Sequence, residues 1–256
     1  MPRGRKPSTS RELPPPLPPE RRTVGQAVAE AVRLYGARFA KALPLGLVVA
    51  TANQLTVGRG RPAVTLVLLL AAPAFTLAFA YATRLTLEVR TPPRSWLVAL
   101  VVGTLAFVPA ALLFPWFALA SVLWLALVGL SVPAAVVEGS GLMASFRRGV
   151  ELARAGYLHA AGAFVTFAVL FALTRTALAL VLRSQADNTV RTAIFLADTI
   201  VAPLLFLGAV IVYVDLDARL RSRGERGKER DADVPDAHDA HREGRPDAAR
   251  EPGPVA

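Results

Sequence analysis

Residues 136–159 read VVEGSGLMASFRRGVELARAGYLH and lie between two long apolar runs. Within this stretch Leu142, Phe146, Val150 and Ala153 recur at helical spacing, so that they form an apolar stripe along one side of a helix. The remaining positions carry charges of both signs. A short amphipathic helix between apolar runs is typical of a helix that lies on the surface of a membrane. The stretch therefore predicts an integral membrane protein.

The charged face of this predicted helix has its own pattern. Glu151 is placed to pair with Arg147 at i,i+4 and with Arg154 at i,i+3. We expect Glu138, Arg147, Arg148 and Arg154 to contact anionic lipid headgroups or a partner protein at the cytoplasmic face. Glu138, at the end of the preceding apolar run, is expected to contact Arg147, Arg148 or the start of the helix rather than to act in catalysis.

Composition supports a membrane domain with polar ends. The 256 residues are 54% hydrophobic with a mean hydropathy of +0.44, above the range of ordinary soluble domains. Residues 42–214 hold only 11 of the 29 basic and 5 of the 19 acidic residues. The basic residues flank apolar runs instead of clustering on one face, so we expect no nucleic-acid partner. The chain has no cysteine, which excludes disulfides and thiolate metal sites.

A crossing of the membrane needs about 20 apolar residues. Residues 95–137 are too long for one crossing, and the FPWF sequence at 114–117 offers a turn because Pro115 breaks a helix. We therefore predict an all-α fold with six transmembrane helices, the first being the shortest. The predicted spans cover residues 42–57, 63–83, 95–113, 117–137, 158–182 and 193–214. Prolines 44, 73, 109, 133 and 203 fall inside these spans and are expected to kink them.

Arginines in the short loops favour a cytoplasmic location for both termini, because positive residues concentrate on the inner side. We expect a multi-pass protein of the bacterial plasma membrane. Residues 1–22, which are basic and Pro-rich, and residues 219–256, which mix both charges with Ala, Gly and Pro, are predicted to be disordered tails around a membrane domain at 23–218.

A second amphipathic helix is predicted ahead of the first span. Thr23 followed by Gln26 fits a capping box, and helical spacing of apolar residues continues to Tyr35. Shifted by 118 residues, this segment matches the 142–160 region at four positions, including Leu34 with Leu152 and Ala37 with Ala155. The two interfacial helices therefore indicate a possible internal duplication.

The segment VVEGSGLMASFRRGVELARAGYLHAAG resembles the Glu-Gly, Ala-x-x-Arg-Ser, Leu and Gly-x-Trp motif of the membrane-domain family associated with glycerophosphodiester phosphodiesterases. The opening TVGQAVAEAVRLYGARF and the closing IVYVDLDARLRS also resemble that family, over residues 23–222. This chain differs in having Arg148 after the motif's arginine and Tyr157 in place of its tryptophan. The resemblance implies a stand-alone six-span bacterial membrane protein. It implies no phosphodiesterase activity, because that chemistry belongs to a separate soluble domain.

Charges inside spans are costly and usually have a partner. Arg175 and Asp198 lie at similar depths from the same outer hairpin, so we predict an ion pair between the last two spans. His159 is expected to be an interfacial residue, and no motif predicts a catalytic, cofactor or metal site. We expect a non-enzymatic membrane protein that organises lipids or partner proteins. The alternative is a small transporter or channel with a polar path near Arg175, Asp198 and Asn53.

Overall fold

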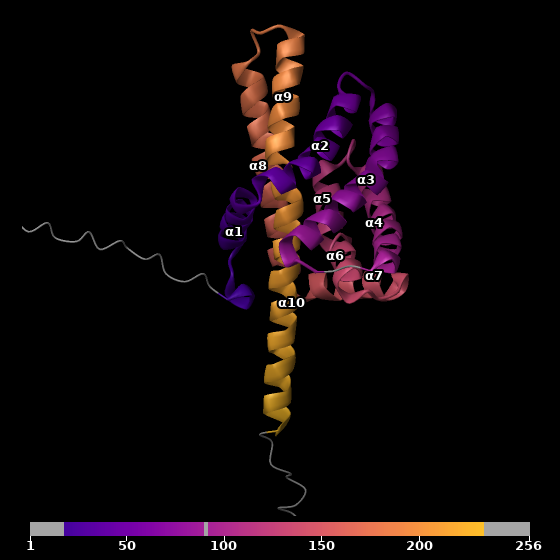
Figure 1. The fold of residues 1–256 in the computed structure, drawn as a ribbon, viewed down its shortest axis with the longest axis vertical. Helices are drawn as coiled ribbons and strands as arrows, with labels where there is room; N and C mark the ends of the chain where they lie inside the picture. Colours follow the sequence, from indigo (N-terminus) through magenta and orange to yellow (C-terminus); the bar gives the residue numbers. More distant parts are fainter. Residues whose placement is uncertain (1–17, 90–91, 233–256) are drawn as a thin grey trace, which may run out of the picture. The chain divides into compact units, whose positions relative to one another are not determined.

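The computed structural model describes residues 18–89 and 92–232, with side chains as far as 226, and these residues form helices without a strand (Figure 1). The chain divides into two compact units, Met1–Arg219 and Leu220–Ala256. In chain order the described elements are the 3₁₀ turn η1 (Pro19–Arg21) and the helices α1 (Val24–Ala37), α2 (Phe39–Thr56), α3 (Arg61–Leu87), α4 (Pro93–Leu113), α5 (Ala118–Val128), α6 (Ser131–Glu138), α7 (Leu142–Ala155), α8 (Tyr157–Val181), α9 (Asp187–Val201) and α10 (Pro203–Ala232).

Five helical segments of the described chain are long and apolar enough to cross a membrane. They are α3, α4, the α5–α6 segment, α8, and the α9–α10 segment as far as Arg226. These segments match the second to sixth predicted spans, of which only residues 117 and 182 fall outside them. The predicted first span, residues 42–57, falls largely in α2, which is not among the five.

The predicted turn at residues 114–117 is confirmed, because α4 ends at Leu113 and α5 begins at Ala118. Two side chains on α5 join the hairpin that results. Trp124 Nε1 donates to the Ala106 carbonyl at 2.9 Å, and Ser121 Oγ donates to the Ala110 carbonyl at 2.9 Å. Both carbonyls belong to α4, so polar groups of the pair are satisfied within the apolar segment.

The prolines have different effects on their helices. Pro203 begins α10 after a break at Ala202, and Pro133 lies in the first turn of α6 after a break at Gly129 and Leu130. Pro44, Pro73 and Pro109 lie inside the continuous helices α2, α3 and α4. A proline at the start of a helix loses no intrahelical bond, since the first amide groups have no partner there.

α2 and α9 approach each other closely at Gly46. Ala42, Gly46 and Ala50 are buried on α2 at intervals of four, the spacing that lets membrane helices pack backbone to backbone. Gly46 lies against Thr199, where a Cβ atom would come within 1.9 Å of the carbonyl oxygen. Because the residue four positions on is Pro203, which has no N–H, the Thr199 carbonyl has no normal helical partner. The freed carbonyl faces the glycine.

The predicted capping box at the start of α1 is confirmed. Gln26 N donates to Thr23 Oγ1 at 3.4 Å, and Thr23 N donates to Gln26 Oε1 at 2.8 Å. The two helices proposed to be copies also coincide in register. α1 and α7 each have 14 residues, and the shift of 118 residues superimposes both their first and their last positions. A single residue joins each to the following helix, Arg38 before α2 and Gly156 before α8.

The first part of α10 is buried in the core of the first unit. Phe206, Leu207 and Val210 pack in one cluster with side chains from α2, α3, α4 and α6. The structure differs from the prediction at residues 219–232, which we expected to be disordered and which continue α10. Helix propagation is far cheaper than nucleation, and Leu, Arg, Glu and Lys here are good helix formers. Residues 1–17 and 233–256 lie outside the described residues.

Candidate functional site

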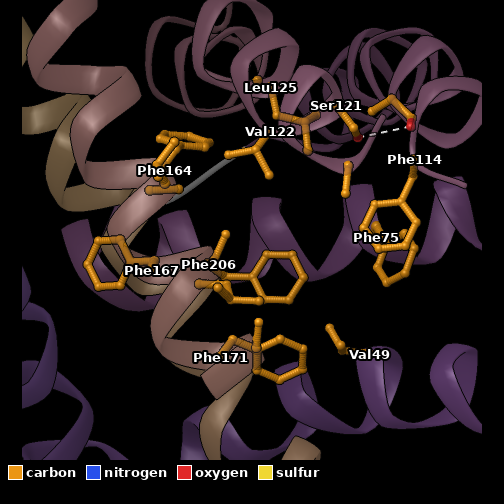
Figure 2. A pocket seen from close by; sticks show the side chains of 18 of the residues that line it. Val49, Phe75, Phe114, Ser121, Val122, Leu125, Phe164, Phe167, Phe171 and Phe206 are labelled. Carbon is orange, nitrogen blue, oxygen red and sulfur yellow. Dashed lines mark hydrogen bonds between the residues drawn. The ribbon is translucent and has the colours of Figure 1, made fainter. Parts of the chain in front are cut away.

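A large apolar cavity lies inside the first unit, with a volume of about 670 Å³. Its lining comes from α2, α3, α4, α5, α8 and α10, and includes eight of the 12 phenylalanines of the chain. Figure 2 shows Phe164, Phe167, Phe171 and Phe206 on one side of the space and Phe75 and Phe114 further along it. The cavity is more than four times the size of the ~150 Å³ apolar cavity that binds benzene in an engineered protein. Its size falls in the range of small-molecule sites.

The sequence reasoning missed this cavity, since the apolar spacing of a span does not show which bulky side chains meet and which leave space. Exposure indicates where the cavity opens. Val169 and Ala172 on α8 and Ala118 and Leu119 on α5 line the cavity and are also exposed. The opening therefore lies beside the second half of α8 and the first turn of α5. If these helices cross a membrane, that opening faces lipid.

The few polar groups in the lining include both Asn53 and Arg175. Arg175 Nε lies 3.3 Å from Asp198 Oδ1, so the structure brings the two predicted partners together. Asn53 Nδ2 donates to Asp198 Oδ2 at 2.8 Å, an interaction that we had not expected. Asp198 is 1% exposed and does not line the cavity, whereas the Arg175 side chain is 31% exposed.

Packing on either side holds this polar group in place. The guanidinium of Arg175 lies 5.7 Å from the ring of Phe171, one helical turn earlier on α8. Asn53 and Asp198 belong to α2 and α9, the pair of helices that meet through Gly46. The close approach of these two backbones therefore determines the distance across the Asn53–Asp198 bond.

Arg148 lies at the centre of a network of ion pairs. Its Nε is 2.9 Å from Glu138 Oε1, Nη2 is 2.8 Å from Asp217 Oδ1, and Nη1 is 3.4 Å from Glu151 Oε2. Burial by itself lowers the pKa of Arg148, but the bonds to Glu138 and Glu151 and the charge of Asp217 outweigh this effect. The pKa is raised as a result, and the side chain stays charged.

Two predictions about this helix need correction. Glu151 pairs with Arg148 rather than with Arg147 or Arg154, because Arg148 is the arginine that turns toward Glu138 at the end of α6 and Asp217 within α10. Arg148 is also engaged within the protein and not directed to headgroups. Arg147 and Arg154 are exposed. The expected contact of Glu138 with one of the two adjacent arginines is found at Arg148.

A second network, around Asp215, was not predicted. Asp215 is fully buried, with Oδ1 3.1 Å from Arg22 Nη1 and Oδ2 3.8 Å from His159 Nε2. Arg219 Nη2 lies 3.4 Å from His159 Nδ1 and donates to the Arg22 carbonyl at 2.5 Å. His159, expected at the interface, has a side chain only 10% exposed. The signal was present in the sequence, since two aspartates at 215 and 217 end an apolar run and buried charges need partners.

The described residues contain no group of three or more His, Asp or Glu side chains that could hold a metal ion. The two histidines of the chain other than His159, His238 and His241, lie outside the described residues. Comparison of the chain with protein-family models, with curated proteins and with solved structures finds no match. The resemblance to the membrane-domain family therefore stays a prediction.

Proposed function

We propose that this protein is a non-enzymatic lipid-binding protein of the bacterial plasma membrane, and that its cavity holds the hydrocarbon chain of a lipid. The observation that carries the proposal is the cavity of about 670 Å³ between five apolar, span-length segments and α2, lined mainly by aromatic and aliphatic side chains. Water binds weakly in a cavity with such a lining, because it finds few hydrogen-bond partners there. An apolar chain entering from the side exchanges lipid contacts for protein contacts of the same kind.

The proposal includes a finer topology. α2 is a further crossing in addition to the five apolar segments, and it is the first along the chain. Its 18 residues span ~27 Å, and it packs against both α3 and α9. Both termini are cytoplasmic. α1 and α7 lie at the inner interface, and Figure 1 shows α7 running crosswise at the ends of α4 and α6. The exposed Arg147 and Arg154 would then meet anionic headgroups, each with about 1 kcal/mol of attraction. The common register of α1 and α7 supports their origin by duplication.

The alternative of a small transporter or channel for a polar solute receives less support from the cavity. A polar path needs hydrogen-bonding groups along its length. Here Asn53 and the adjacent Arg175 and Thr176 lie at one end of the lining on α2 and α8, and the buried Ser121 already bonds the Ala110 carbonyl. The remaining space is bounded by phenylalanines and aliphatic residues. We therefore favour binding of an apolar chain.

The test fills the cavity. Ala168 lines the cavity on α8, and Ala168→Trp places an indole inside it. Ala177→Trp, on an exposed position of the same helix outside the lining, is the matched control. The full chain is reconstituted in nanodiscs of phosphatidylethanolamine and phosphatidylglycerol and extracted with detergent. Native mass spectrometry then counts the lipids that stay bound.

We expect one lipid to remain bound to the unsubstituted protein and to Ala177→Trp, and little or none to Ala168→Trp. Equal retention by the two tryptophan variants would show that lipid is held elsewhere and would refute the proposal. Melting temperatures of the three proteins in detergent show whether each variant is folded.

A further inference from the structure

We propose that Arg175 recognises an ester carbonyl of the lipid in the cavity, so that the site selects ester-linked glycerolipids regardless of headgroup charge. This inference rests on the proposed function and identifies the chemical class of the ligand. It follows from the atoms that Arg175 leaves available, from the net charge at the end of the cavity, and from the depth of Arg175.

Arg175 lines the cavity, and its guanidinium carries hydrogen-bond donors. In its ion pair with Asp198 the nearest atoms are Nε and Oδ1, 3.3 Å apart and without a hydrogen bond, and the guanidinium also lies near the ring of Phe171. The two Nη atoms carry the remaining N–H groups of the guanidinium, which has donors and no acceptor. Asp198 does not line the cavity. A ligand in the cavity therefore meets donors from Arg175 and is separated from the carboxylate.

The charge balance favours an uncharged acceptor over an anion. Arg175 and Asp198 together are neutral at a distance of 3.3 Å. An anion bound to Arg175 would leave one net negative charge in an apolar surrounding, and burying an uncompensated charge is costly. A carbonyl oxygen accepts the same hydrogen bond and adds no charge. Bonds from a charged donor to a neutral acceptor are still worth about 1.5–3 kcal/mol.

The depth of Arg175 matches an ester group. α8 has 25 residues and is ~37 Å long, compared with a hydrocarbon core of about 30 Å. If its middle, near residue 169, lies at the membrane centre, Arg175 is ~9 Å away and thus ~6 Å inside the hydrocarbon boundary. The guanidinium stays inside the boundary, because it lies 5.7 Å from the ring of Phe171, one helical turn nearer the membrane centre. An ester carbonyl is then the first acceptor of a glycerolipid that it meets. Ester carbonyls join acyl chains to glycerol at that boundary, while phosphate groups lie further out.

The cavity extends from this polar end in the direction that an acyl chain would follow. Phe164 is 11 residues before Arg175 on α8 and also lines the cavity, so the lining runs for ~16 Å along this helix. With its ester at Arg175, one acyl chain would lie among the phenylalanines. The glycerol and headgroup would remain outside the cavity.

The experiment compares four synthetic lipids with the same chains on the full-length protein in detergent. They are ester-linked phosphatidylglycerol and phosphatidylcholine, and the ether-linked form of each, which lacks the carbonyl. Each competes with a phospholipid that carries a fluorophore on its acyl chain. We expect the two ester lipids to compete within about threefold of each other and the ether forms to be roughly tenfold weaker, the equivalent of about 1.4 kcal/mol.

Variants assign the preference to Arg175. The double substitution Arg175→Leu/Asp198→Leu removes both charges together, and we expect it to bind ester and ether lipids equally, at the affinity of the ether forms. Arg175→Lys is a second test that does not depend on the folding of the double variant. It keeps a cation beside Asp198 but lacks the forked donors of the guanidinium, so we expect it to reduce the preference for ester lipids.

Each other outcome has a defined meaning. Equal binding of ester and ether lipids by the unsubstituted protein refutes the recognition of the carbonyl and leaves chain binding intact. A strong preference for phosphatidylglycerol in both linkages shows that Arg175 reads an anionic head, which also refutes the inference. If Ala168→Trp binds all four lipids as the unsubstituted protein does, the proposed function itself fails.

Discussion

Gly46→Ala tests the close contact on which the polar end of the cavity depends. The added methyl carbon would lie 1.9 Å from the Thr199 carbonyl oxygen and 2.6 Å from its carbon, whereas real Cβ contacts are essentially never shorter than 3.0 Å. α2 and α9 must therefore separate locally by about 1 Å. The Asn53–Asp198 bond lies two turns along α2, and the same separation would lengthen it from 2.8 Å to beyond the normal limit.

The expected cost has two parts. Overpacking of a close contact costs about 1–3 kcal/mol, and loss of a hydrogen bond to a charged acceptor costs about 1.5–3 kcal/mol. We expect a total of about 3–5 kcal/mol, which lowers the melting temperature by roughly 10 °C or more for a chain of this size. Thermal unfolding of the purified protein in detergent, followed by intrinsic fluorescence, measures the change.

Gly36→Ala is the matched control for Gly46→Ala. Gly36 lies near the end of α1, and beyond its chain neighbours and the backbone of its own helix turn no atom lies within 4 Å of the position that an added methyl group would take. Alanine there should therefore be neutral or stabilising by up to about 1 kcal/mol. If both variants melted within about 2 °C of the unsubstituted protein, α2 and α9 would not be in contact at this point. The account of the polar group would then be wrong.

The ion pairs give two further predictions, checked by the same melting measurement. Arg148→Gln should lower the free energy of unfolding by about 1–3 kcal/mol, because Glu138 and Asp217 lose their shared cation. The control Arg147→Gln, at an exposed position, should change it by less than about 0.5 kcal/mol. Equal effects of the two substitutions would contradict the network. Asp215→Asn should lower the free energy of unfolding by about 3 kcal/mol, because Arg22 loses the buried carboxylate. The control Glu30→Gln, in the exposed pair with Arg33, should have no measurable effect. If Asp215→Asn were no more destabilising than Glu30→Gln, the buried pair would be refuted.

Local chemistry made several features predictable from the sequence. The start of α1 followed from a capping box, which involves residues three apart, and the turn at 114–117 followed from a proline within a run too long for one crossing. Arg175 and Asp198 could be matched because helical rise converts position along the chain into depth. Such inferences need one or two helices and the distance along them, and both are contained in the sequence.

Features that depend on three or more helices were not predictable. The spacing of α7 placed Arg147, Arg148 and Arg154 on one polar side, but only the positions of α6 and α10 decide that Arg148 turns inward. The third member of the Arg175–Asp198 group, Asn53, comes from α2, whose place beside α9 depends on the contact at Gly46. The cavity is the strongest case, since it is lined by side chains from six helices.

The two aspartates near the end of the buried part of α10 give α1 and α7 a common anchor. Asp215 binds Arg22, immediately before α1, and Asp217 binds Arg148 on α7. Residues two apart on a helix point to nearly opposite sides, so one short segment can hold both α1 and α7. These charges therefore have a structural role that accounts for their burial. The group around Arg175 differs, because its cation borders an open apolar space with donors that no described residue uses, and recognition of a ligand is the function that we expect there.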